Sequence, residues 1–124
     1  MTIQELYAKI DGNYEHAIQI MRMDKLVDRY VRKLAGSGAY DSLVAAGETL
    51  DPTAMFESAH VLKGVTANLG LDGLAAKVGV ITEEFRPGNA RSLSDDAVKA
   101  ALAEVGELYQ KTLAGIREYE ESNK

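Results

Sequence analysis

Residues 51–70 read DPTAMFESAHVLKGVTANLG, and this stretch decides the fold. Asp51 followed by Pro52 is typical of a helix N-cap and first helical position. Gly70 suits the residue after a helix end, because a positive φ costs glycine little. At about 100° per residue, a helix from Pro52 to about Leu69 gathers one apolar side, formed by Met55, Ser58, Leu62, Val65 and Leu69. The stretch therefore predicts an amphipathic helix that buries this side.

The rest of the chain repeats apolar residues at the same helical spacing, and no segment alternates strictly as a half-buried strand would. We expect helices from about Thr2, which forms a capping-box pattern with Glu5, to Gly12; from Tyr14 to about Leu34, with a bend near 21–24; from Tyr40 to Gly47; from Pro52 to about Leu69; from Leu71 to about Arg86; and from Ser94 to about Tyr119. The connection at Gly70 is so short that the two helices it joins must be antiparallel neighbours. The sequence predicts an all-α protein: an antiparallel up-and-down four-helix bundle with short additional N-terminal helices, in one domain over residues 1–124.

Composition narrows the classes of function. The 124 residues carry a net charge of −5, with acidic and basic residues interleaved, which argues against a nucleic-acid surface. The absence of cysteine excludes disulfides and thiolate chemistry. No basic leader precedes an apolar run, and no stretch approaches the roughly 18 apolar residues of a membrane span. We expect a cytoplasmic protein, monomeric, with other proteins as partners and neither nucleic acid nor membrane among them.

His60 lies almost opposite the apolar side of the helix from Pro52. A histidine that faces water is not a core histidine with its ring nitrogens satisfied internally. Gly64 costs roughly 1 kcal/mol relative to alanine in a helix interior, which is reasonable if another molecule must approach there. Lys63 supplies a mobile ammonium one turn from the imidazole. Six residues share this exposed surface with His60: Thr53, Phe56, Glu57, Lys63, Gly64 and Ala67.

An exposed imidazole is suited to reversible phosphoryl transfer. Its neutral form is well populated near pH 7 and has a nucleophilic nitrogen. The chain has no acidic cluster convincingly placed for Mg²⁺ and no glycine-rich phosphate loop. We therefore expect no cofactor of its own, and a partner that supplies the metal.

The segment AHVLKGVTANLG, residues 59–70, resembles the signature of histidine phosphotransfer (HPt) domains, in which leucine, lysine and glycine follow the histidine at +2, +3 and +4. His60, Leu62, Lys63 and Gly64 match this pattern. The resemblance implies phosphorylation of the imidazole Nε2, and docking of a receiver domain, with its own Mg²⁺, over the same face. It also implies a relay in a two-component system with a response regulator, a hybrid histidine kinase, or both.

Carried over to this chain, the resemblance makes His60 the phosphoacceptor, Lys63 the charge that stabilises the phosphoryl group, and Gly64 the residue that admits the receiver. The protein would then be a phosphocarrier and not an enzyme, either free-standing or excised from a larger chain. Partner contacts are expected from Phe56, Glu57 and Ala67.

Two other functions remain open on the sequence: a binding-only adaptor or inhibitor that uses the same face without accepting phosphate, and a cofactor-carrying bundle with His60 as axial ligand or general base. His16 lacks a lysine or glycine companion, so we expect a solvated or half-packed side chain. Five tyrosines should line the core edge, Tyr7, Tyr14, Tyr30, Tyr109 and Tyr119, and five glutamates should be solvated, Glu83, Glu84, Glu118, Glu120 and Glu121.

Overall fold

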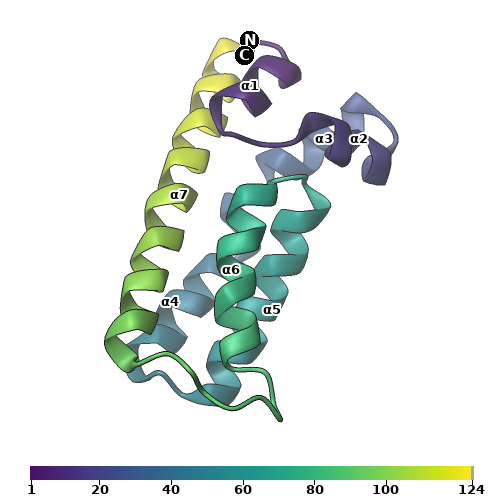
Figure 1. Ribbon diagram of the computed structural model, residues 1–124. Coiled ribbons are helices and arrows are strands. Elements are labelled where there is room, and N and C mark those ends of the chain that lie inside the picture. Colours follow the sequence, from purple (N-terminus) through teal and green to yellow (C-terminus); the bar gives the residue numbers. More distant parts are fainter. Residues whose placement is uncertain (124) are drawn as a thin grey trace.

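The computed structural model describes residues 1–123, and within them the chain is helical with no strand, which confirms the all-α prediction (Figure 1). The elements in chain order are α1 (Ile3–Lys9), α2 (Tyr14–Met21), α3 (Asp24–Arg32), the 3₁₀ helix η1 (Ala35–Ser37), α4 (Ala39–Thr49), α5 (Pro52–Asn68), α6 (Asp72–Glu84) and α7 (Asp95–Ser122).

Three helices begin where the sequence predicts a cap. Thr2 and Glu5 form a reciprocal capping box at the start of α1. The Asp51 side chain accepts a hydrogen bond from the Ala54 amide at 3.0 Å, and Ser94 caps α7 in the same way. These starts depend on local hydrogen bonds, so they can be read from the sequence.

The stretch from Tyr14 to Leu34 is two helices and not one bent helix. Arg22 adopts a left-handed conformation with φ of 77°, which ends α2, and α3 starts at Asp24. The two helices pack against different neighbours, because α2 contacts α5 whereas α3 contacts α7. The change of direction at Arg22 lets α2 bury Ala17 while α3 buries Val27 and Val31.

The long helices lie side by side (Figure 1). Helix α5 contacts α4 and α6, and α7 contacts α6 and α4, while α1 covers the C-terminal part of α7. The largest fully buried side chains come from every α-helix except α2, and from the connection between α3 and η1: Leu6, Tyr7, Val27, Val31, Leu34, Leu43, Met55, Leu62, Val78, Ile81, Val98 and Val105. Helix α5 is thus held on both flanks, with its remaining side open.

Glycines allow the N-terminal segment to approach the other helices. Gly70 has a φ of 68°, and a Cβ there would lie 2.4 Å from the Asn13 carbonyl oxygen. The Asn13 amide also donates a hydrogen bond of 2.7 Å to the Gly70 carbonyl. On α7, a Cβ at Gly115 would lie 2.4 Å from the Cγ2 atom of Ile10.

The two ends of the described chain meet, as Figure 1 shows. The Asn123 side chain accepts a hydrogen bond from the Met1 ammonium at 3.3 Å and donates one to the Met1 carbonyl at 2.9 Å. None of the helices in residues 1–123 has the length and apolar character needed to cross a membrane.

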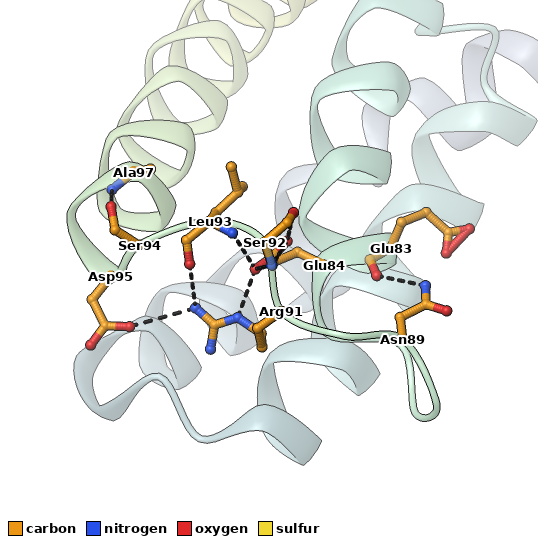
Figure 2. Close-up of polar contacts among 9 residues, drawn as sticks. All are labelled: Glu83, Glu84, Asn89, Arg91, Ser92, Leu93, Ser94, Asp95 and Ala97. Carbon is orange, nitrogen blue, oxygen red and sulfur yellow. Dashed lines mark hydrogen bonds and ion pairs between the residues drawn. The ribbon is translucent and has the colours of Figure 1, made fainter.

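Glu84 is buried, which contradicts the prediction that it is solvated. The segment from α6 to α7 folds back over its carboxylate (Figure 2). This carboxylate accepts hydrogen bonds from Arg91 Nε at 2.7 Å, from the Ser92 amide at 3.1 Å and from the Leu93 amide at 2.9 Å. The hydrogen bond from the Leu93 amide, followed by those from Arg91 and Ser92, lowers the pKa of Glu84 to about 2.

The tyrosines follow the prediction in part. Tyr7, Tyr109 and Tyr119 are buried and Tyr14 is half-buried, but Tyr30 is 46% exposed. Tyr30 lies on the side of α3 that turns away from α7, next to the Lys33 ammonium, 5.9 Å from the ring centroid.

Candidate functional site

His60 is exposed on α5, as the helical wheel predicts. No other residue within 1–123 forms a hydrogen bond with either ring nitrogen. Its imidazole stacks on the Phe56 ring one turn earlier, with ring centroids 5.4 Å apart and an angle of 20° between the planes. The stack orients the imidazole and leaves both nitrogens open to a reactant.

Phe56 is half-buried, which corrects the expectation of an exposed ring for partner contact. It packs against the hydrophobic core, and the Arg86 guanidinium lies 5.2 Å from its ring centroid. Because α6 runs alongside α5, it covers part of a side that the wheel of α5 alone leaves open. Phe56 therefore supports His60 more than it offers a free apolar surface.

The other expected partner contacts differ in exposure. Glu57 is exposed and Ala67 is half-buried. Gly64 is exposed, and a Cβ built on it would have no atom within 4 Å. The surface one turn after His60 is therefore low and free of obstruction.

Lys63 is half-buried and lies across α6. Its Cε and Nζ atoms come within 3.5 and 3.9 Å of the position that a Cβ would take at Gly79. The stem of Lys63 therefore rests on a helix surface that lacks a side chain. Its ammonium forms no direct ion pair with any residue in the described part of the chain.

Glu83 near the end of α6 and Arg86 just after this helix are charged residues near the candidate site that the sequence analysis did not include in it. Glu83 pairs with Arg86, with Oε2 and Nε 2.5 Å apart. The hydrogen bond from Arg86 lowers the pKa of Glu83, and the positive charges of Arg86, Lys63 and His60 lower it further. Arg86 in turn lies over the Phe56 ring on which His60 stacks, so the Glu83 carboxylate belongs to the surroundings of the imidazole.

A signal for these two residues was present in the sequence. In two antiparallel helices joined by a tight turn, residues at equal distance from the turn lie level with each other. Counting from the turn at Gly70, Val80 is level with His60, so Glu83 falls about one turn beyond that level. Arg86 follows near the level of Phe56, whose ring it contacts.

A shallow groove of about 940 Å³ runs beside this face, between α5, α6 and the segment before α7. Lys63, Gly79, Val80 and Glu83 are part of its lining. A smaller apolar groove of about 400 Å³ lies on the other flank of α5, where Val65 is part of its lining.

His16 lies apart from these residues and is half-packed, as expected. Its Nδ1 atom is 2.7 Å from Asp72 Oδ1, and Asn13 donates a hydrogen bond of 3.0 Å to the other oxygen of that carboxylate. Residues 1–123 contain no group of three or more histidine or acidic side chains arranged to hold a metal ion.

No family model matches the chain, and no match was found among curated proteins or among solved structures.

Proposed function

We propose that this protein is a histidine phosphotransfer protein, which relays a phosphoryl group between His60 and an aspartate of a receiver domain. In this proposal α4, α5, α6 and α7 form the antiparallel up-and-down bundle of an HPt domain. One observation supports it above all. Within residues 1–123, an exposed imidazole with no hydrogen bond to its nitrogens shares a helix face with Lys63, which forms no direct ion pair, and with an unobstructed glycine, Gly64.

In the transfer step, Nε2 of neutral His60 attacks the phosphorus of the partner's aspartyl phosphate. The bond between phosphorus and the aspartate oxygen breaks, its electron pair returns to the carboxylate, and a phosphorus–nitrogen bond forms. Lys63, one turn from His60 on α5, supplies a mobile ammonium that would balance the negative charge on the phosphoryl oxygens. The partner supplies the aspartate and its Mg²⁺, so His60 acts as a carrier.

The low surface at Gly64 serves this reaction by admitting the receiver. In-line attack requires the two proteins to approach until phosphorus lies near Nε2. A side chain at position 64 would extend into that approach path, whereas Glu57 and Ala67 remain at its border. We place the reaction in the cytoplasm, with a response-regulator receiver, a hybrid histidine kinase, or both, as partner.

The test is transfer from phosphorylated receiver domains of the source organism. The wild-type chain should become labelled with a phosphoryl group that is labile in acid and stable in alkali, as a phosphohistidine is. His60→Gln should abolish the label, whereas His16→Gln should retain it, since these are the two histidines of the chain.

Two results would contradict the proposal. One is equal labelling of His60→Gln and wild type. The other is a receiver that binds wild type and His60→Gln equally well and labels neither, which would indicate the adaptor function instead.

A further inference from the structure

Two cationic side chains near His60, Lys63 and Arg86, have a carboxylate close to them. This carboxylate belongs to Glu83 on α6. Glu83 pairs with Arg86 at 2.5 Å, and Arg86 lies over Phe56, on which His60 stacks. Glu83 also shares the groove beside α6 with Lys63. The surroundings of His60 therefore already hold one negative charge, that of Glu83. A phosphoryl group on His60 would add about two more negative charges.

The direction of the Glu83 side chain agrees with this arrangement. Figure 2 shows Glu83 and Glu84 leaving the end of α6 in opposite directions, with Glu84 pointing into the segment before α7. The Glu83 backbone carbonyl is fixed by a hydrogen bond of 3.0 Å from the Asn89 side chain. The Glu83 carboxylate is about half exposed, so it can move when a stronger anion competes for Arg86.

We propose that Glu83 shortens the lifetime of phosphohistidine at His60, by repelling the phosphoryl group and by keeping Arg86 from pairing with it. This inference rests on the proposed phosphorylation of His60 and adds a residue that sets how long the phosphoryl group stays. Glu83 acts through charge and through Arg86, so it is a positioning residue and not a catalytic one.

The reaction that Glu83 accelerates is loss of the phosphoryl group to water. A water oxygen attacks phosphorus, the phosphorus–Nε2 bond breaks with its electron pair going to nitrogen, and protons pass to solvent to leave neutral imidazole and inorganic phosphate. A nearby carboxylate raises the free energy of the phosphorylated state, because like charges repel.

The experiment uses phosphoramidate as donor, so that no partner protein is needed. Transfer breaks the phosphorus–nitrogen bond of phosphoramidate, releases ammonia and forms the bond to Nε2. The proteins are wild type, Glu83→Gln, Glu83→Asp and, as a control for net charge, Glu107→Gln. Glu107 is exposed on α7 and forms no ion pair within residues 1–123.

After removal of the donor, the half-life of phosphohistidine is measured by ³¹P NMR or by loss of label. Glu83→Gln should lengthen the half-life by about three- to tenfold, the range expected for one exposed charge near a dianion. Glu83→Asp should stay close to wild type, and Glu107→Gln should not differ from it. The effect of Glu83→Gln should shrink in ~1 M salt, where the screening length falls to about 3 Å.

Equal half-lives for Glu83→Gln and wild type would overturn the inference, and so would a Glu107→Gln effect of the same size. An effect that does not change with salt would also overturn it, because it would indicate altered packing. If receivers fail to label the chain while phosphoramidate labels His60, the relay is disproved and the comparison of half-lives still decides the role of Glu83. No label on His60 from either donor would overturn both.

Discussion

Glu84 keeps its negative charge in a buried position because the segment before α7 surrounds it with donors. Besides three hydrogen bonds from Arg91 Nε and two backbone amides, it accepts one of 3.0 Å from the Ser92 hydroxyl. Hydrogen bonds to a charged group are stronger than those between neutral groups. This single side chain therefore holds the connection between α6 and α7 in place.

We expect Glu84→Gln to lower the melting temperature at pH 7, because a neutral amide is a weaker acceptor and its NH₂ group faces other donors. The folded-state pKa of about 2 lies below the ordinary 4.5. The stabilisation is therefore fully present above about pH 4.5 and is lost as the pH falls towards 2. Thermal unfolding from pH 7 to pH 2 should show the two proteins converging below pH 4.5. A constant difference over this range would contradict the pKa of Glu84.

Glu104→Gln is the matched control for this series. Glu104 is 65% exposed and pairs with Lys77 at 3.3 Å. Exposed pairs of this kind contribute little to stability, so this variant should melt close to the wild type at every pH.

At the scale of one helix, Gly64 lowers the stability of α5, and the surface around this glycine is unobstructed. Gly64→Ala should stabilise the protein by about 0.5–1 kcal/mol, because alanine favours a helix interior and its Cβ meets no atom within 4 Å. The same variant should slow transfer from a receiver while leaving labelling by phosphoramidate unchanged. Urea unfolding and the two labelling assays measure these effects.

Gly73→Ala provides the comparison, since Gly73 on α6 is also exposed and open. It should leave transfer from the receiver unaffected. Faster transfer in Gly64→Ala, or equal slowing in both variants, would contradict the role of Gly64 in admitting a partner.

The sequence predicts elements well where their signals are local. The start of α5 at Asp51 and Pro52 and the exposure of His60 both follow from a single helix and its cap. The break at Arg22 does not, because it depends on α2 and α3 packing against different helices. Glu84 is missed for the same reason, since its partners come from a segment whose path no local pattern specifies.

Only part of the candidate site can likewise be predicted from local sequence patterns. His60 and Gly64 can be placed from α5 alone, whereas the half-burial of Phe56 also depends on Arg86, which lies just after the end of α6. Glu83 joins the site only because α6 packs against α5, and this packing cannot be predicted from the pattern of either helix alone.

At the scale of the whole molecule, α1 is held against α7 by close contact at Gly115. Gly115→Ala should destabilise the protein by about 1–3 kcal/mol, because its Cβ would lie 2.4 Å from the Ile10 Cγ2 atom and α1 must shift. Urea unfolding measures the loss, and hydrogen exchange should show reduced protection in α1. The double variant Gly115→Ala/Ile10→Ala should lose less free energy of unfolding than the sum of the losses in the two single variants. Full additivity would indicate that the two residues do not touch.

The meeting of Met1 and Asn123 has a consequence for how the chain can be rearranged. A short linker between the two ends would close the backbone into a ring without moving a helix. The ring could then be opened at the exposed turn of Arg22 and Met23, which gives a circular permutant with new ends and the same helix contacts. A reporter joined before Met1 or after Asn123 would, by the same geometry, emerge from one corner of the molecule.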